Sequence, residues 1–221
     1  MGGALVEKST RLQAGPRRPA RPRLRKRPWQ VLLLGGPSGV GKTAVSYRLA
    51  RHFGVGLTEV DDFQVLLERM TTPEQQPAIH FWRTHPAPQQ LPAAEIIQHL
   101  LEQSRAVSLG LEAVIANHLE AGTPAVLEGD FVLPGLAAQA SFSGQANGGR
   151  VRAVFLDEPD EQQFLANYLS REPERGPQFK RAQVSWLHGQ WLRHEAERFG
   201  MPVVLARPWD TVLERLIAAV S

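Results

Sequence analysis

Short apolar runs alternate with longer segments of helical periodicity along most of this chain. The apolar runs are bounded by glycine, proline or acidic residues and predict buried β-strands at residues 31–34, 55–60, 124–129, 151–156 and 202–206. Between them, apolar residues at helical spacing predict helices at residues 43–53, 62–70, 92–121, 160–169, 179–199 and 210–220. Strands that alternate with helices favour an α/β fold, here a five-stranded parallel sheet with helices on both faces.

Two segments lack a clear period. Residues 71–92 are rich in Pro, Gln and Thr and are expected to be irregular, and residues 143–149 are expected to form a loop. Because ligands of parallel sheets bind at the carboxyl ends of the strands, the residues that follow each predicted strand are the first candidates for a site.

The first 28 residues differ in composition from the rest of the chain. They hold nine Lys or Arg residues and one acid, with several prolines. Such a segment cannot bury apolar area and its charges repel one another, which predicts a disordered basic tail at 1–28 and one folded domain at 29–221. We interpret the tail as a solvated segment. The alternative is a basic arm that binds nucleic acid or an anionic surface.

Composition excludes several classes of protein. The domain carries sixteen basic and twenty-one acidic residues, so it shows no sign of a nucleic-acid-binding face. The absence of cysteine excludes disulfides, thiolate zinc sites, iron–sulfur clusters and cysteine nucleophiles. No run of eighteen apolar residues and no apolar segment beside the N-terminal charges is present, so neither a membrane span nor a secretory signal is expected. We therefore expect a cytoplasmic protein.

One motif carries specific chemistry. Residues 36–43 read G-P-S-G-V-G-K-T and fit the phosphate-binding pattern G-x-x-x-x-G-K-[ST] in full. Its glycines let backbone N–H groups turn toward phosphate oxygens, and the following helix directs its positive N-terminus at the same anion. We expect Lys42 to reach the β- and γ-phosphates of ATP and Thr43 to bind Mg²⁺. The predicted nucleotide contacts are Gly36, Pro37, Ser38, Gly39, Val40, Gly41, Lys42, Thr43 and Ala44.

This motif occurs in several classes of protein, and the rest of the chain narrows the choice. A GTPase would need the guanine-binding motif N-K-x-D, which is absent. A motor ATPase would need an apolar strand that ends in two adjacent acids and a larger body, and neither is closely matched. A small one-domain enzyme that moves a phosphoryl group from ATP to a small acceptor remains.

Three segments resemble known small-molecule kinases. Residues 33–43 look like the start of P-loop kinases related to 2-phosphoglycerate kinase. Residues 60–63 (V-D-D-F) resemble the V-D-x-F of chloramphenicol phosphotransferase-like kinases, in which the aspartate takes the proton of the acceptor hydroxyl. Residues 127–134 are similar to the E-G segment of the 2-phosphoglycerate kinase-like group. The resemblance implies an adenylate-kinase-like layout with ATP and Mg²⁺, and it leaves the acceptor open.

Acidic residues after the second and third strands are the catalytic candidates. We expect Asp61 to act as the base, and Asp62 to cap the following helix or to lie near Mg²⁺ or the acceptor. The alternative is that both aspartates only cap the helix. Glu128 and Asp130 could hold Mg²⁺ or an acceptor hydroxyl. The alternative is that both are solvated acids at a strand end.

Arginines are the natural partners of a phosphoryl group in transfer. In this kinase class a lid with catalytic arginines falls near residues 171–177, which makes Arg171 and Arg175 candidates. The alternative is a charged connector in which arginines and glutamates pair. Arg207, with Trp209, follows the fifth strand, where related kinases cradle adenine. The alternative there is that Trp209 packs in the core.

The segment around Arg83 combines histidine and aromatic residues and could bind the acceptor, with Arg83 holding an anionic group. The alternative is a short helix whose aromatic residues fill the core. The remaining histidines, at positions 52, 99, 118, 188 and 194, are expected on helix surfaces.

These features predict ATP-dependent transfer of the γ-phosphoryl group to a hydroxyl of a small molecule. Two alternatives share the donor site: a nucleoside or nucleotide kinase, and a toxin-like kinase of a sugar nucleotide. A third, of another class, is a nucleotide-dependent nucleic-acid-binding protein that uses the basic tail. We expect a monomer or a homodimer.

Overall fold

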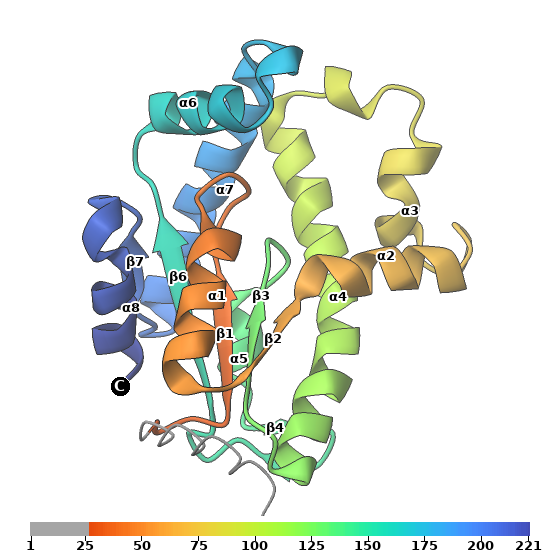
Figure 1. The fold of residues 1–221 in the computed structure, drawn as a ribbon. Helices are drawn as coiled ribbons and strands as arrows, with labels where there is room; N and C mark the ends of the chain where they lie inside the picture. The colour runs from red at the N-terminus through yellow and green to blue at the C-terminus, as the bar shows by residue number, and fades with distance from the viewer. Residues whose placement is uncertain (1–26) are drawn as a thin grey trace, which may run out of the picture.

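A computed structural model describes residues 27–221, so the predicted basic tail lies outside the described residues except for its last two positions. The five predicted strands are present and form one parallel sheet in the order β2-β3-β1-β6-β7 (Figure 1). They are β1 (Val31–Gly35), β2 (Gly56–Glu59), β3 (Ala125–Glu128), β6 (Val151–Asp157) and β7 (Val203–Leu205). This confirms the predicted α/β fold class.

The central strand, β1, lies between β3 and β6, and all five strands run in the same direction. In this register Leu34 lies beside Glu128 on one side and Val154 on the other. The segments that follow these strands therefore emerge at one edge of the sheet, at the top of Figure 1.

Side chains of β1 alternate between two cores, as the pleat of a strand requires. Val31 and Leu33 belong to one hydrophobic cluster, and Leu32 and Leu34 belong to the other. All four side chains are fully buried. Burying one such side chain stabilises the fold by about 1.5–3 kcal/mol, so this short run anchors both layers.

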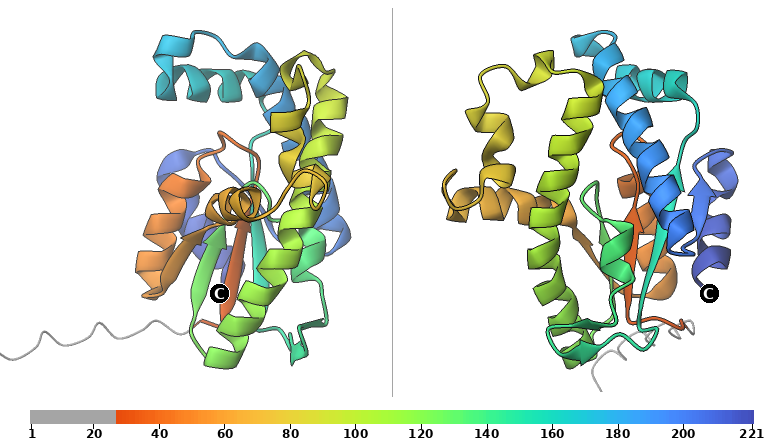
Figure 2. Two further views of the ribbon diagram at one scale, coloured as in Figure 1. Left: turned by 90° about the vertical axis from the view of Figure 1, so that its right-hand side faces the viewer. Right: turned by 180° about the vertical axis from the view of Figure 1, so that it is seen from behind.

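Helices cover both faces of the sheet (Figure 2). The Leu32 side is covered by α1 (Lys42–Phe53) and α8 (Val212–Val220), with α6 (Glu161–Arg171) above them. The Leu33 side is covered by α4 (Ala93–Ala121), α5 (Pro134–Ala137) and α7 (Phe179–Arg198). Two further helices, α2 (Val60–Met70) and α3 (Pro77–Thr84), project from the sheet edge beside α4.

The expectation that residues 71–92 are irregular is wrong. They contain α3 and the short 3₁₀-helix η1 (Pro88–Gln90). Packing against α4 stabilises α3, because Phe81 stacks on His99 with ring centroids 3.6 Å apart and Trp82 Nε1 donates a 2.7 Å hydrogen bond to Gln103. The alternative of a short helix is confirmed, but its aromatic residues do not fill the core, because Phe81 and Trp82 are half-buried against α4.

Several smaller elements refine the predicted boundaries. Part of the predicted loop at 143–149 pairs in a hairpin of β4 (Ser141–Phe142) and β5 (Gln145–Ala146). Two 3₁₀-helices, η2 (Pro173–Arg175) and η3 (Trp209–Thr211), precede α7 and α8. No helix within residues 27–221 is both long and apolar enough to cross a lipid bilayer.

Candidate active site

The loop between β1 and α1 takes a backbone conformation that requires glycine. Gly36, Gly39 and Gly41 have φ angles of 147°, 81° and 97°, a region that side chains with a Cβ rarely adopt. Neighbouring side chains also leave no room for a Cβ, which would lie 2.8 Å from Tyr168 at Gly39 and 2.6 Å from Trp209 at Gly41. The side chains of Tyr168 and Trp209 therefore hold the loop in a fixed curve at the carboxyl edge of the sheet.

The polar side chains of the motif point at the end of the neighbouring strand. Lys42, which is 6% exposed, donates a 3.0 Å hydrogen bond from Nζ to the carbonyl of Pro37 and forms an ion pair with Asp130. Thr43 Oγ1 donates a 2.8 Å hydrogen bond to Glu128 Oε1. The structure thus brings together Lys42, Thr43, Glu128 and Asp130, which the sequence proposed as separate candidates.

Glu128 is the most enclosed acid of this group. Its side chain is 2% exposed, and its Oε2 has no hydrogen-bond partner within residues 27–221. Burial raises the pKa of this carboxyl group, while the charge of Lys42 and the hydrogen bond from Thr43 oppose that rise. An unpaired buried carboxylate oxygen beside a hydroxyl is suited to accept a cation.

Asp61 lies opposite the loop, in the first turn of α2. Gly129 makes this approach possible, because a Cβ there would lie 2.7 Å from Val60 Cβ and 3.2 Å from Asp61 Oδ1. The carboxylate remains open to solvent, yet partial burial, followed by repulsion from Asp130, raises the pKa of Asp61. A carboxyl group with a raised pKa is a better proton acceptor than an ordinary aspartate.

The helix that carries Asp61 begins earlier than predicted. Its N-cap is Glu59, with no side-chain capping bond found there in the described chain, so the expectation that Asp62 caps this helix is wrong. Asp62 is exposed in the first turn of α2. Because neither aspartate occupies the cap position, helix capping does not account for the two acids.

A cleft of about 550 Å³ lies above the loop. It is enclosed by the loop, by the first turns of α1 and α2, by one face of α6 and by η3, and its lining residues are Ser38, Gly39, Val40, Gly41, Lys42, Thr43, Ala44, Asp61, Asp130, Asn167, Tyr168, Ser170, Arg171 and Trp209. Most of the predicted nucleotide contacts and two of the predicted acids therefore face one cavity.

The wall formed by α6 was not anticipated from the sequence. Asn167 Nδ2 donates a 2.9 Å hydrogen bond to the carbonyl of Gly39, and the hydroxyl groups of Tyr168 and Ser185 are 2.7 Å apart. Tyr168 is fully buried and packs against Gly39. Helical periodicity could have placed Tyr168 on the inner face of this helix, but not against the loop, 128 residues from Asn167 in the chain.

Both predicted lid arginines contact one carboxylate, that of Glu172. Arg171 donates to it at 3.0 and 2.8 Å, Arg181 at 3.1 and 3.0 Å, and Arg175 lies 3.2 Å away. The hydrogen bond from Arg171 leads the causes that lower the pKa of Glu172 to about 2. Arg171 lines the cleft, whereas Arg175 does not. The contacts seen here are those of the alternative reading, a connector with paired charges.

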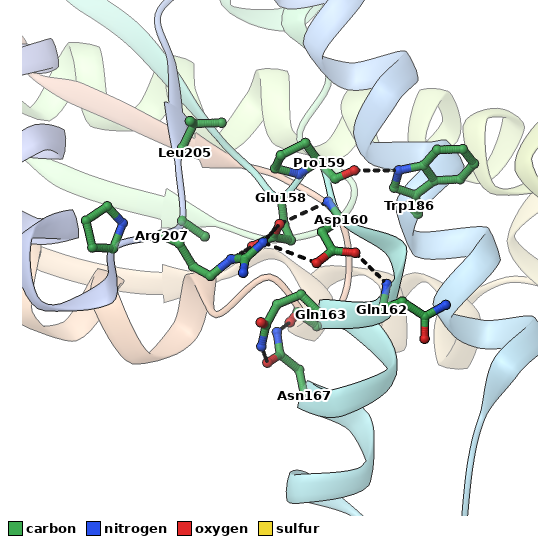
Figure 3. A network of polar contacts seen from close by, with 12 residues as sticks. Glu158, Pro159, Asp160, Gln162, Gln163, Asn167, Trp186, Leu205 and Arg207 are labelled. Atoms are coloured by element: carbon green, nitrogen blue, oxygen red, sulfur yellow. Dashed lines mark hydrogen bonds and ion pairs between the residues drawn. The ribbon is translucent and has the colours of Figure 1, made fainter.

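Arg207 lies outside the cleft lining and takes part in a polar network (Figure 3). Its guanidinium donates two 2.7 Å hydrogen bonds to Glu158 and lies 3.5 Å from Asp160. Asp160 caps α6 by accepting from the Gln162 N–H at 3.0 Å. This network fixes the start of α6, while Trp209, which is 40% exposed, covers Gly41 and lines the cleft.

Arg83 lies on α3, away from the cleft lining, with its Nε 3.3 Å from Glu68 Oε1 on α2. Its side chain is 61% exposed. No described contact joins this arginine to the acids around the loop. The structure therefore leaves it on the projecting α2–α3 unit.

The expectation that His188 lies on a helix surface is wrong. Its side chain is 1% exposed, because α7 packs closely over the loop at the adjacent Gly189, where a Cβ would lie 3.1 Å from Pro37. A second helix position of the same type, His194, is exposed as predicted.

Comparison with solved structures shows a shared fold. The chain has the fold of a crystallised sugar kinase from Janibacter sp. HTCC2649, with a TM-score of 0.52, 17% sequence identity and coverage of 86% of this chain and 94% of that one. The chain therefore shares its fold with this kinase, and it carries the complete phosphate-binding motif at residues 36–43.

Sequences similar to this chain include proteins named 2-phosphoglycerate kinase. The one from Pyrococcus horikoshii is 32% identical over 109 residues, which cover 48% of this chain and 36% of the relative. The one from Methanothermobacter thermautotrophicus is 24% identical over 205 residues, which cover 86% of this chain and 65% of the relative. The chain thus spans between about a third and two thirds of the length of these relatives. No protein-family model matches it.

Proposed function

We propose that this protein transfers the γ-phosphoryl group of ATP to a hydroxyl group of a small acceptor. The observation that carries the proposal is that the phosphate-binding loop, Lys42 and two acids, Asp61 and Asp130, line one cleft. A third acid, Glu128, is buried beside the loop and accepts a hydrogen bond from Thr43. Phosphoryl transfer depends on positioning and on neutralising charge, and this group supplies both.

The loop would hold the phosphates of ATP through its N–H groups and the start of α1. Lys42 would exchange its contact with Asp130 for the β- and γ-phosphates, which leaves the Asp130 carboxylate, 23% exposed, facing the cleft. The predicted contacts from Gly36 to Ala44 all belong to this loop or to the first turn that follows it.

Thr43 and Glu128 would hold Mg²⁺ together with the phosphates. The unpaired Oε2 of Glu128 beside the Thr43 hydroxyl fits this cation. The described residues hold no cluster of three or more His, Cys, Asp or Glu that could bind a metal alone. That fits an ion which proteins usually bind through one or two carboxylates plus substrate phosphates. Bound Mg²⁺ supplies neutralising positive charge at the transferring phosphoryl group.

Asp61 would accept the proton of the acceptor hydroxyl. It lines the cleft across from the loop, and its raised pKa favours proton acceptance in the ionised form. Arg171, which also lines the cleft, and Arg175 would turn from Glu172 toward the charge of the moving phosphoryl group. Arg171 needs the smaller movement because it already faces the cavity.

The adenine base would stack on Trp209 at the mouth of the cleft. This assignment replaces Arg207, whose guanidinium is engaged with Glu158 and Asp160. Trp209 packs on Gly41 and keeps part of its ring exposed, so a planar base has a free aromatic surface beside the loop.

The first acceptor to test is 2-phosphoglycerate, the substrate in the names of the sequence relatives. It is anionic, so cationic side chains must face it. Arg171 lines the cleft, and Arg83 on the α2–α3 unit is a candidate that closure of this unit would have to bring nearer. Asp62, an acid in the first turn of α2, would instead accept a hydrogen bond from an acceptor hydroxyl. A cytoplasmic location remains a prediction from the sequence.

The experiment is an acceptor panel with labelled ATP and Mg²⁺, followed by the mass of the product. We expect label transfer to one hydroxyl-bearing anion with the wild-type protein and none with Lys42→Ala, while circular dichroism shows both folded. Removing one such charge-stabilising group lowers turnover by about 10²–10³-fold. Failure of the wild-type protein to bind Mg-ATP in calorimetry would contradict the proposal.

A further inference from the structure

A buried imidazole lies behind the phosphate-binding loop, and the mechanism proposed above does not use it. His188 on α7 is 1% exposed, and its Nε2 has no hydrogen-bond partner within residues 27–221. A buried polar group without a hydrogen-bond partner destabilises the folded state. A leucine at this position would avoid that cost. We therefore expect the imidazole to form a hydrogen bond in another state of the site, such as the nucleotide-bound one.

The surroundings of His188 connect it to the Lys42–Asp130 pair. The next residue, Gly189, lets α7 approach until a Cβ would lie 3.1 Å from Pro37 Cγ. The carbonyl of Pro37 accepts the 3.0 Å hydrogen bond from Lys42 Nζ, and the same ammonium pairs with Asp130. Helix α7 therefore packs directly on the residues that position the ion pair.

The protonation state of His188 suits a neutral donor. Burial lowers the pKa of this imidazole to about 4, and the charges of Asp130 and Lys42 act on it in opposite directions. At neutral pH the ring is uncharged and carries one N–H. That N–H can be given to a carboxylate without placing a second cation beside Lys42.

Nucleotide binding would change the partners of Asp130. Lys42 cannot keep its present contact with Asp130 while it turns to the β- and γ-phosphates, so the carboxylate loses its cation as the phosphates arrive. A carboxylate without a partner in this partly buried place would be poorly held. His188 Nε2 is buried and has no partner in the described chain, and the charge of Asp130 acts on this imidazole, so His188 can take over that contact.

We propose that His188 is a positioning residue that donates a hydrogen bond from Nε2–H to Asp130 when Lys42 turns to the nucleotide. The imidazole acts through Asp130 and touches neither the acceptor nor the phosphates. The inference rests on the proposed function, because the nucleotide is what draws Lys42 away.

The direct test is nuclear magnetic resonance of ring nitrogens in protein with ¹⁵N-labelled histidine, with His188→Gln used to assign the signal. We expect Mg²⁺ with AMP-PNP, a non-hydrolysable ATP analogue, to move the Nε2–H signal of His188 downfield and to protect it from exchange. The ligand-free Lys42→Ala variant should show the same shift, because Asp130 is then free. In Asp130→Ala the shift should be absent. If the Nε2–H signal of His188 is unchanged both in the complex with AMP-PNP and in ligand-free Lys42→Ala, the inference is overturned.

Stability and kinetics provide the second test. His188→Leu should leave the Tm of the ligand-free protein unchanged or higher, while kcat falls about tenfold, as expected for one lost hydrogen bond to a charged group. His188→Gln, which keeps an N–H donor, should recover part of kcat. The matched control is His194→Leu on the exposed side of the same helix, which should leave kcat unchanged.

A purely structural role predicts a different result. In that case His188→Leu lowers Tm and kcat together and the glutamine gives no recovery, which would overturn the inference. If the wild-type protein does not bind Mg²⁺ and AMP-PNP, the proposed function fails instead. The Lys42→Ala spectrum would then still decide whether Nε2 bonds to Asp130.

Discussion

The hydroxyl of Thr43 donates a 2.8 Å hydrogen bond to Glu128, a residue at the end of the neighbouring strand. This contact joins the last residue of the phosphate-binding motif to a buried acid, and the second oxygen of that acid has no partner in the described chain. In the proposed function this pair would supply two ligands of a Mg²⁺ ion, and phosphates and water would complete its shell.

Glu128→Gln should weaken Mg²⁺ binding without lowering the stability of the fold. The amide keeps the contact with Thr43 and loses the negative charge, so we expect the apparent Mg²⁺ affinity during turnover to fall by about 10- to 100-fold, the range seen when groups around a metal are changed. The measurement is the rate as a function of Mg²⁺ concentration at saturating ATP. The matched control is Glu59→Gln, another acid at a strand end, which bonds to Tyr47. Equal Mg²⁺ dependence in both variants would contradict the site.

Asp61→Asn should separate catalysis from stability. Loss of a general base lowers kcat by about 10²–10⁴-fold, with little change in the calorimetric affinity for Mg-ATP. Because the pKa of Asp61 is raised in the folded protein, its ionisation opposes folding at pH values above the ordinary aspartate pKa of about 3.9. The asparagine variant should thus have a higher Tm than wild type at pH 7, and the difference should vanish as the pH falls below about 4.

The pH profile provides a control for the same assignment. The acidic limb of kcat/KM should lie above the ordinary aspartate range, because the rate requires ionised Asp61. Asp130→Asn removes a charge that raises the pKa of Asp61, so whatever activity remains should show this limb at lower pH. If the acidic limb of the kcat/KM profile lies at the same pH in Asp130→Asn as in the wild type, Asp61 is not the base.

Substitutions of Arg207 and of Trp209 should have different effects: the first on stability, the second on ATP affinity. Arg207→Ala leaves the Glu158 carboxylate, 2% exposed, without its two hydrogen bonds, and we expect the free energy of unfolding to fall because a buried charge loses its partner. Trp209→Ala should lower ATP affinity roughly tenfold through lost stacking, with a smaller loss of stability. Urea unfolding and calorimetry with ATP measure the two effects. If Arg207→Ala lost affinity while keeping full stability, the original assignment of Arg207 to adenine would be restored.

Glu172→Gln should release the arginines beside the cleft. The Glu172 carboxylate pairs with Arg171, Arg175 and Arg181 and, in the proposed function, would compete for them with nucleotide phosphates. Its removal should raise the affinity for Mg-ATP by up to about fivefold, because exposed ion pairs contribute less than about 1 kcal/mol each. The control is Glu174→Gln in the same segment. The effect should be constant from pH 5 to 9, since a pKa of about 2 keeps Glu172 ionised throughout. Weaker binding in Glu172→Gln would show that the cluster must stay assembled.

The sheet and its loop could be predicted because each depends on residues close together in the chain. A run such as 31–34 is apolar at every position, which only a strand buried on both faces requires. Helix α3 could not be predicted in this way. Its inward side chains are held by His99 and Gln103 of α4, so the segment is helical because a distant helix covers it.

The burial of single polar residues also could not be predicted from the sequence. His188 and His194 lie on the same helix and have the same side chain, yet one is buried and the other exposed. The difference comes from the close approach of α7 to the loop at Gly189. The partners of Arg207 likewise depend on the adjacency of β6 and β7 in the sheet.

What the sequence determined by itself is that residues 36–43 carry a complete phosphate-binding motif, because eight consecutive residues contain the glycines, the lysine and the hydroxyl that the motif requires. What only the tertiary structure decided is which acids meet that loop. Lys42 and Asp130 are 88 residues apart in the chain, and they pair because β1 and β3 are neighbours in the sheet. Sheet order is set by how side chains from all strands and helices pack together, and no local stretch of sequence carries that information.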